Sequence, residues 1–365
     1  MKRSVLLLIS HSCNLSCRYC YEHYKDARKM TCEEAINILT TEFASSPEDI
    51  TGIDLLGGEP LTNFGIIPDL CKWIWNQNPS MQVFIRTNGT LLTQTMKDWF
   101  MENNKLVGLG ISVDGTPDNN LFNRGFKDLD LDFFRDNWPD IPAKFTVFPD
   151  SANLLTESVI YLHHRGFNVI GGIAQGVKWN KDACKELNRQ MGKLVEYYSV
   201  NMLIEPPKPL FSLDFNNAYN YFDSTNLEKP CWERDVVHTY DCDYELLPCH
   251  MFSSLVQGKE GRATIINDYL NVCHDLCDEE CMQCPIRWSC VNCMALNYHL
   301  YRDFKRNANK VLSCEAHNII AYWSAILLTK RAMKGVLDLS NIGIRDSITN
   351  AIKFIKEYDA FDRGY

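Results

Sequence analysis

The first 200 residues alternate between two patterns of hydrophobic and polar positions. Short runs rich in Val, Ile, Leu and Phe are separated by amphipathic stretches of helical length, and Thr31 followed by Glu34 predicts the start of the first helix. This alternation predicts βα units, which form a parallel sheet with right-handed crossovers, and six units can curl into a partial barrel. The predicted strands are residues 4–10, 52–56, 82–86, 107–113, 143–148 and 168–173, and the predicted helices are residues 32–44, 66–76, 92–103, 129–138, 154–165 and 182–198.

The pattern changes near residue 206. From there to residue 314 the chain is rich in Cys, Asn, Asp and aromatic residues, with weak periodicity, as expected of a small domain held together by metal. Helical patterning returns afterwards. The predicted fold is therefore α/β: a partial (β/α)6 TIM-like barrel in residues 1–205, a small cysteine-rich domain in residues 206–314 and a C-terminal helical segment in residues 315–365.

Charge and hydropathy narrow the class of protein. The 37 Lys and Arg residues against 46 Asp and Glu give a net charge of −9, which argues against a nucleic-acid partner. No apolar run reaches the roughly 18 residues of a membrane span. The apolar run at residues 5–9 is shorter than the about 7–15 residues of a signal peptide core, and no cleavage site follows it. We therefore expect a cytoplasmic enzyme without a membrane or nucleic-acid partner.

The 16 cysteines are clustered. Because no secretion signal precedes them, clustered thiols favour metal ligation over disulfides. Three lie at the start of the chain and ten in its last third, with only Cys32, Cys71 and Cys184 between them. The first group is Cys13, Cys17 and Cys20; the second is Cys231, Cys242, Cys249, Cys273, Cys277, Cys281, Cys284, Cys290, Cys293 and Cys314.

The first three cysteines share an eight-residue loop directly after the first predicted strand. Three thiolates can hold three irons of a 4Fe-4S cluster and leave the fourth iron open to another ligand. Structural zinc requires four closed ligands, and the nearest fourth thiol, Cys32, lies in a predicted helix. Buried thiols without a function are the remaining alternative. The spacing therefore favours a cluster with one open iron.

This loop, with the pattern C-x3-C-x-Tyr-C, resembles the signature of the radical SAM enzymes. The resemblance implies that Cys13, Cys17 and Cys20 hold a 4Fe-4S cluster whose open iron binds S-adenosylmethionine (SAM). In that family, an electron from a donor such as flavodoxin or ferredoxin cleaves SAM to methionine and a 5′-deoxyadenosyl radical, which abstracts a hydrogen atom from the substrate. The cofactor carries the chemistry, and the protein supplies position and excludes water.

Further motifs follow successive predicted strands in the order of that family. The sequence Gly57-Gly58-Glu59-Pro60 resembles the family's GGEP element, which implies contacts to the ammonium of SAM. Tyr19 matches the position whose backbone meets the adenine, and Arg124 matches the arginine that pairs with the SAM carboxylate. Polar contacts to the cofactor are implied for Asn88, Ser112 and Asp114. Alone, each motif has an ordinary structural interpretation, such as a turn or a solvated charge.

The last third resembles a SPASM domain, which holds two auxiliary 4Fe-4S clusters. The resemblance implies three clusters in the chain. It departs from the family pattern at Tyr244, where a glycine is expected, and before Cys293, where the spacing is x2 instead of x3. Zinc is the alternative metal, because C-x2-C pairs also form zinc sites. The implied ligands are Cys281, Cys284, Cys290 and Cys314 for one cluster, and Cys231, Cys249 and Cys293 for the other, with Cys242 as its fourth ligand and Cys273 and Cys277 as competitors.

SPASM-type radical SAM proteins mostly modify peptides or proteins. The resemblance therefore implies ribosomal-peptide maturation by cross-linking, thioether formation or epimerisation. Because the first strand begins at Ser4, we expect no preceding leader-binding domain, so that the cleft or a separate protein would bind a leader.

Oxidation of a sulfatase Cys or Ser to formylglycine is the alternative reaction. His250 stands where sulfatase-maturing enzymes have an aspartate, which counts against it. His250 is nevertheless the candidate proton acceptor, and a hydrogen-bonded structural histidine is the other interpretation. An alternative of another class is a non-catalytic zinc or iron–sulfur binding protein.

Overall fold

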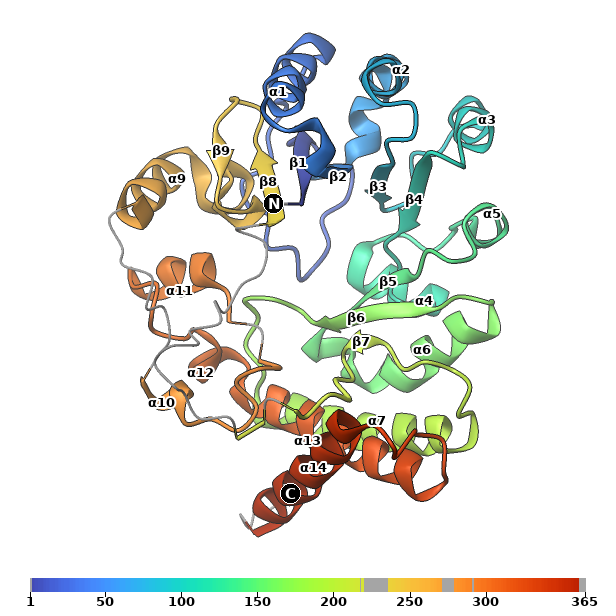
Figure 1. Ribbon diagram of the computed structural model, residues 1–365, viewed down its shortest axis with the longest axis vertical. Coiled ribbons are helices and arrows are strands. Elements are labelled where there is room, and N and C mark those ends of the chain that lie inside the picture. Colours follow the sequence, from blue (N-terminus) through green and yellow to red (C-terminus); the bar gives the residue numbers. More distant parts are fainter. Residues whose placement is uncertain (1, 217, 220–235, 271–278, 291, 361–365) are drawn as a thin grey trace.

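A computed structural model describes residues 2–216, 218–219, 236–270, 279–290 and 292–360 and shows a curved, mostly parallel sheet with helices outside it (Figure 1). The α/β prediction is confirmed, and the six predicted strands form within two residues of their expected bounds. They are β1 (Arg3–Ser10), β2 (Ile50–Gly57), β3 (Val83–Thr87), β4 (Val107–Ile111), β5 (Ala143–Val147) and β6 (Val169–Ile173).

The six predicted helices also form, and one further helix, residues 117–124, was not predicted. Thr31 and Glu34 form the expected capping box: Glu34 N donates to Thr31 Oγ1 over 3.2 Å and Thr31 N donates to the Glu34 carboxylate over 2.6 Å. The helices are α1 (Cys32–Ser45), α2 (Ile67–Gln77), α3 (Gln94–Glu102), α4 (Pro117–Arg124), α5 (Leu131–Asn137), α6 (Leu155–His164) and α7 (Lys181–Val200), with 3-10 helices η1 (Pro47–Asp49), η2 (Pro60–Ile66) and η3 (Pro149–Leu154).

The strands form two sheets that meet at one seam. One has the order β4-β3-β2-β1-β8-β9 and the other the order β5-β6-β7. A parallel bridge between Ser112 and Lys144 connects them, and Val113 N donates to Lys144 O over 2.9 Å. The remaining strands are β7 (Lys208–Pro209), β8 (Val237–Tyr240) and β9 (Leu246–Leu247). The result is the predicted partial barrel, with its strands' carboxyl ends at one rim (Figure 1).

Strand β8 lies within the predicted cysteine-rich domain but belongs to the barrel sheet. It pairs in parallel with β1, from Ser4 opposite Val237 to Leu7 opposite Tyr240. The first sheet therefore crosses the expected boundary at residue 205. The pattern of residues 206–314 did not predict this strand. Four residues are too few to show a periodicity, and the strand is defined by its pairing with β1. The domain bounds stay a prediction.

The core lies between the sheet and its outer helices. Val5, Leu7 and Ile9 of β1 are fully buried toward this layer, whereas Leu6 and Leu8 face the barrel interior. Both faces of β1 are covered, which is why its sequence is a continuous apolar run and does not alternate. The interior face is wider than its side chains can fill, and this leaves room for a cavity.

The cysteine-rich segment has a smaller core of its own, around Phe252, Leu255 and Ile265. Its elements are the 3-10 helix η4 (His250–Phe252) and the helices α9 (Ser254–Leu270), α10 (Glu279–Met282), α11 (Met294–Tyr301) and α12 (Asn309–Leu312).

The C-terminal helical segment packs beside the barrel. Helix α13 (Cys314–Met333) lies against α7, where Trp323 Nε1 donates to Asn188 over 2.7 Å, and α14 (Ile342–Ala360) lies against α13 (Figure 1). Among the helices of the described ranges, none combines the length and the apolar character needed to cross a bilayer.

Candidate active site

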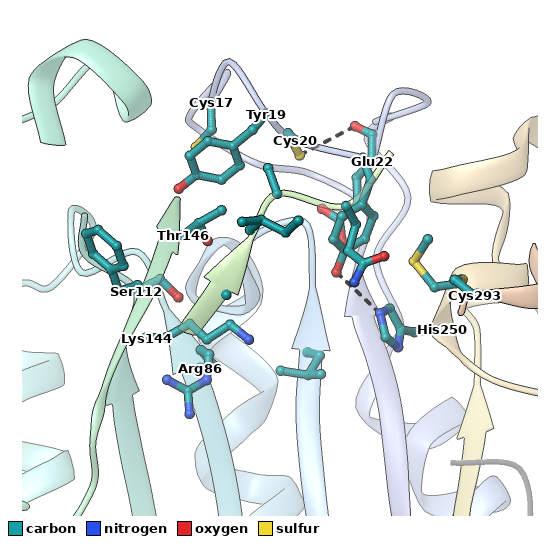
Figure 2. Close-up of a pocket in the computed structure, with 18 of the residues that line it drawn as sticks. Cys17, Tyr19, Cys20, Glu22, Arg86, Ser112, Lys144, Thr146, His250 and Cys293 are labelled. Atoms are coloured by element: carbon teal, nitrogen blue, oxygen red, sulfur yellow. Dashed lines mark hydrogen bonds between the residues drawn. The ribbon is translucent and has the colours of Figure 1, made fainter. Parts of the chain in front are cut away.

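The carboxyl ends of the strands open into one cavity of about 730 Å³. Loops at the ends of β1, β2 and β3 contribute to it, as do the inner faces of the strands and the cysteine-rich segment. Figure 2 shows the cysteine loop at one side of the cavity and Arg86 and Lys144 at the other. Of the predicted site residues, the lining contains Cys13, Cys17, Tyr19, Cys20, Gly57, Gly58, Glu59, Asn88, Ser112, Arg124, Cys249, His250 and Cys293.

The three thiols of the first loop face this cavity and are half-buried. The loop is held at Arg18, whose N donates to Asn123 O over 2.9 Å, and at Cys20, whose N donates to Cys17 O over 3.1 Å. Burial raises the pKa of Cys13 to about 11, although the Lys25 charge acts in the opposite direction. A donor set of three thiols on one short loop, with one side open to a cavity, fits three irons of a 4Fe-4S cluster.

The glycines at the end of β2 allow a close approach to the end of β1. Gly57 has a φ of 146°, and a Cβ there would lie 2.1 Å from Ser10 O. A Cβ on Gly58 would lie 2.8 Å from Ser12 O. Gly58 N donates to Ser10 O over 2.9 Å and Glu59 N donates to Ser12 O over 2.8 Å. Only glycine allows this contact, which aligns the cysteine loop with the following turn.

The Glu59 carboxylate ties together the ends of β2 and β3. It is buried and accepts hydrogen bonds from Thr87 Oγ1 over 2.7 Å, Asn88 N over 2.8 Å and Leu61 N over 3.1 Å. Burial raises its pKa above the ordinary range. Asn88 Nδ2 in turn donates to Asn14 Oδ1 over 3.0 Å, in the cysteine loop. Glu59 and Asn88 therefore organise the loops at this rim in addition to lining the cavity.

Arg124 and Asp114, which the family pattern assigns separately to cofactor contacts, form a buried ion pair of 3.0 Å. Tyr19 Oη donates to the other oxygen of Asp114 over 2.6 Å, and Thr146 N donates to Asp114 over 3.2 Å. Asp114 is thus occupied by partners from three elements. The Nε of Arg124 is buried and has no hydrogen-bond partner among the described residues, which leaves a donor at the cavity.

The carboxyl-terminal cysteines fall into two environments. Burial raises the pKa of Cys290 to about 12, and the nearby thiols of Cys314, Cys284 and Cys281 also raise it, so these four predicted ligands lie together. Asn307 Nδ2 donates to Cys281 Sγ over 3.4 Å and Asn309 Nδ2 donates to Cys290 Sγ over 3.5 Å. Cys249 and Cys293 line the main cavity instead, and the predicted Cys231, Cys273 and Cys277 lie outside the described residues.

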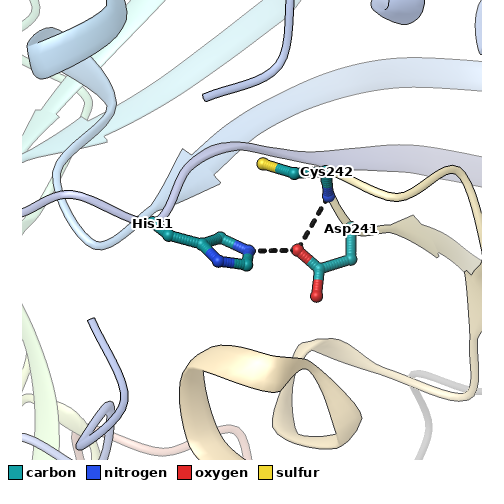
Figure 3. Close-up of side chains that lie close together, drawn as sticks. All are labelled: His11, Asp241 and Cys242. Carbon is teal, nitrogen blue, oxygen red and sulfur yellow. Dashed lines mark hydrogen bonds and ion pairs between the residues drawn. The ribbon is translucent and has the colours of Figure 1, made fainter. Parts of the chain in front are cut away.

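Cys242 has other neighbours than the cavity-lining Cys249 and Cys293. Figure 3 shows it beside His11 and Asp241, where the three ligand atoms lie within 4.8 Å of one another. Its Sγ donates to Leu8 O over 3.1 Å, and it does not contribute to the cavity lining. The Asp241 carboxylate pairs with His11 Nε2 and accepts from Cys242 N over 2.8 Å. Cys242 as a cluster ligand therefore stays a prediction that this packing does not favour.

Several charged cavity residues were missed by the sequence analysis. Burial raises the pKa of Glu22 to about 7, and Lys25 lies near the cysteine loop, with its Nζ 3.3 Å from Leu15 O. Arg86 and Lys144 come from the inner faces of β3 and β5. The signal for Lys144 was present, because Lys144 and Thr146 alternate with apolar residues in β5 and mark one face of that strand, whereas Arg86 follows Phe84 on its face of β3.

His250, the candidate proton acceptor, reaches the cavity from the start of η4. Its Nε2 lies 3.3 Å from Tyr21 Oη, as the dashed line in Figure 2 shows. This contact joins the cysteine loop to the cysteine-rich segment.

Known proteins are similar to this chain over its first part. The family described as a 4Fe-4S single cluster domain matches residues 3–128, the part that contains the three-cysteine loop. An uncharacterized protein of Methanocaldococcus jannaschii is 30% identical over 122 residues, which are 33% of this chain and 41% of that protein. The radical SAM cyclopropyl synthase TigE of Paramaledivibacter caminithermalis is 26% identical over 119 residues, 28% of this chain and 25% of that protein. The chain thus spans less than half the length of these curated relatives.

Solved structures match over most of the chain. A structure of anSMEcpe with bound AdoMet has a TM-score of 0.63 at 15% identity and covers 96% of this chain and 99% of its own. Streptococcus suis SuiB bound to precursor peptide SuiA has a TM-score of 0.58 at 15% identity, covering 86% and 76%. The chain therefore has the same fold as these two structures. The resemblance carried by the Cys13–Cys20 loop and the motifs after β2 and β4 is therefore confirmed at the level of the fold.

Proposed function

We propose that this chain is a radical SAM enzyme that modifies a peptide, most simply a ribosomally made one, by cross-linking, thioether formation or epimerisation. One observation carries the proposal. The three thiols of the first loop, the Gly57–Glu59 turn and Arg124 line one cavity, although they come from three separate places in the sequence. A metal site that did not open into the barrel would not need these elements to line the same cavity.

Cys13, Cys17 and Cys20 would hold the 4Fe-4S cluster, which when bound supplies the electron that cleaves SAM. Arg124 would bind the carboxylate of SAM through its free Nε, held in place by Asp114. The backbone around Gly58 and the buried Glu59 carboxylate would bind the ammonium. The barrel wall then excludes water from the reacting groups.

The peptide would enter from the side of the cysteine-rich segment. Cys249, Cys293 and His250 lie at that side of the cavity, and His250 contacts Tyr21 of the cysteine loop. Two auxiliary 4Fe-4S clusters would be held there, one by Cys281, Cys284, Cys290 and Cys314. The electron donor would be an external protein of the flavodoxin or ferredoxin class, and a leader would be recognised by this cavity or by a separate protein. SuiB, crystallised with a precursor peptide, supports a peptide as the class of substrate.

The decisive measurement is iron and sulfide content after anaerobic reconstitution, together with SAM cleavage under dithionite. Three clusters predict about 12 irons per chain, and Cys13→Ala/Cys17→Ala/Cys20→Ala lowers this to about 8 and abolishes 5′-deoxyadenosine. About 4 irons, all lost in the variant, would contradict the auxiliary clusters. Stoichiometric zinc without iron would contradict the radical mechanism and favour a non-catalytic metal-binding protein.

Oxidation of a Cys or Ser side chain to formylglycine is the second candidate. The observation that favours it is the position of His250, which lies in the cavity with its Nε2 3.3 Å from Tyr21 Oη and could act as the base. A synthetic Cys-containing sulfatase peptide would distinguish the two reactions: aldehyde formation, lost in His250→Phe and kept in His250→Asp, supports formylglycine formation.

A further inference from the structure

The barrel interior carries charges on the side of the cavity away from the cysteine loop. Asp54 of β2, Arg86 of β3 and Lys144 of β5 all line the cavity. We call these three residues the cavity floor. Figure 2 shows Arg86 and Lys144 on the other side of the drawn residues from Cys17 and Cys20. The floor therefore combines two cationic side chains with one carboxylate.

The Arg86 side chain is built into the barrel wall. Its guanidinium carbon lies 5.1 Å from the centre of the Phe84 ring, and a Cβ on Gly110 of β4 would lie 3.1 Å from that same carbon. Gly110 therefore provides the space in which the guanidinium rests against β4. The Nη1 of Arg86 is buried and has no hydrogen-bond partner among the described residues.

Lys144 is held at the seam between the two sheets. Its backbone bridges to Ser112 and accepts a hydrogen bond from Val113 N over 2.9 Å, which fixes where its side chain starts. The side chain then extends into the cavity (Figure 2).

Enclosing the Arg86 guanidinium is costly unless a ligand binds its Nη1, which is unpartnered among the described residues. Burial lowers the pKa of Arg86, and only the Asp54 charge opposes this shift. A guanidinium pairs best with a planar carboxylate, through two parallel hydrogen bonds, and a nearby ammonium adds a point charge. Arg124, on the cysteine side, already provides a donor for SAM, so the floor is available to the other reactant.

We propose that the cavity floor binds a carboxylate of the substrate, so that the enzyme selects peptides with an acidic side chain or a free C-terminus in the cavity. This inference rests on the proposed function, which makes the substrate a peptide. Arg86 and Lys144 are then specificity residues, and Asp54 limits how strongly the floor attracts anions.

The test is a binding selection with the full chain, reconstituted anaerobically and immobilised in the presence of SAM. The probes are three N-acetylated random hexapeptide libraries: amidated with Asp and Glu allowed, free at the C-terminus without Asp or Glu, and amidated without either. Mass spectrometry of retained peptides compares each of the first two libraries with the neutral third. We expect about tenfold enrichment of one of them, because a charge-assisted pair to a buried cation is worth that factor or more.

The first library reports an acidic side chain and the second a C-terminal carboxylate. Enrichment of neither over the neutral library overturns the proposal. Arg86→Met and Lys144→Met should each remove most of the enrichment, and Asp54→Asn should increase it. A folding defect would lower the enrichment in all three variants, so an increase in Asp54→Asn indicates a specific effect. Iron content and thermal unfolding of each variant also detect a folding defect.

Lys105→Met, which removes an exposed lysine, is the charge-matched control and should keep the enrichment. Loss of enrichment in this control, or its persistence in both floor variants, overturns the inference. Weaker SAM binding in Arg86→Met with unchanged peptide selection would assign the floor to SAM and also overturn it.

Release of 5′-deoxyadenosine by the wild type is measured separately. Carboxylate selection without SAM cleavage would contradict the proposed function and not the floor, whereas SAM cleavage without selection would contradict the floor alone.

Discussion

The barrel and the cysteine-rich segment are stabilised in different ways. In the barrel, β1 contributes Val5, Leu7 and Ile9 to a large apolar core that continues through the outer helices. The cysteine-rich segment, over its described residues, has a core of only 12 buried hydrophobic residues, including Cys249. Buried amides supply much of the remaining order: Asn297 Nδ2 donates to Asn292 Oδ1 over 2.8 Å. A core this small holds a loop-rich segment only with help from ligands.

The two regions are joined by buried polar contacts beside β1 and β8. Asp241, at the end of β8, pairs with His11 at the end of β1 and accepts from Ser254 N over 3.2 Å. Glu42 of α1 accepts from Arg3 Nε over 2.9 Å and from His238 Nδ1 over 2.8 Å. The site therefore depends on both kinds of stabilisation, because its cavity is lined from both regions.

Removal of iron should cause the largest difference in amide protection between the barrel and the cysteine-rich segment. After chelation under anaerobic conditions, we expect amide hydrogens of α11 and α12 to exchange about 100-fold faster or more. Those of β1–β4 should change little, because a large apolar core holds these strands and the three-thiol loop lies outside them. Hydrogen exchange with mass spectrometry measures both in one sample. Equal loss of protection in the barrel strands would contradict the comparison.

Asp241→Asn should break the contact between the regions. The buried carboxylate has donors on both oxygens, and loss of its charge should destabilise the chain by about 3–5 kcal/mol. Denaturant unfolding of the reconstituted protein measures this. Glu245→Gln, at an exposed carboxylate paired with Arg262, is the control and should cost less than about 1 kcal/mol.

The same variant predicts a pH dependence. Burial acts to raise the Asp241 pKa, but bonds with His11, Cys242 N and Ser254 N outweigh it and lower that pKa from 3.8 to about 2. A lowered folded-state pKa stabilises the fold above pH 3.8, and this contribution is lost as the pH falls toward 2. The difference in stability between wild type and Asp241→Asn should be constant from pH 7 to 5 and shrink below pH 4. A constant difference down to the lowest pH at which the protein folds would refute this.

A matched pair of core substitutions compares the two cores directly. Leu7 and Leu255 are both at most 1% exposed, one in each core. Leu7→Ala should cost about 4–5 kcal/mol and Leu255→Ala about 2–3 kcal/mol, because the smaller core collapses more easily around a cavity. Chemical denaturation of each variant gives the values. A larger cost for Leu255→Ala would show that the cysteine-rich core is as tightly packed as the barrel.

The smallest expected effect concerns the amides beside the thiols. Asn309→Ala removes a donor to Cys290 Sγ and should lower the reduction potential of the cluster proposed there by about 40 mV. The lost hydrogen bond is worth about 1 kcal/mol and stabilises the reduced state of the cluster, which carries more negative charge. Anaerobic redox titration followed by electron paramagnetic resonance measures the shift. Asn350→Ala, which loses a bond to Phe215 O instead, is the control and should leave the potential unchanged.

Much of the barrel could be predicted from local pattern. The strand around Leu7 is a continuous apolar run, and the capping residues Thr31 and Glu34 mark a helix start without reference to the rest of the chain. The cysteine-rich segment offered no such periodicity. Its strand β8 forms because β1 has an open edge, and that edge exists only after the barrel has assembled.

The candidate site also contains features set by the local sequence and features set by tertiary contacts. The sequence alone determined the three-thiol loop and the Gly57–Glu59 turn, because spacing and glycine content act over a few residues. Only the tertiary structure decided that Arg124 pairs with Asp114, that Cys242 packs beside His11, and that Arg86 and Lys144 share one cavity floor. These contacts join residues from different strands and loops, and their partners are set by the curvature of the sheet, which no local pattern specifies.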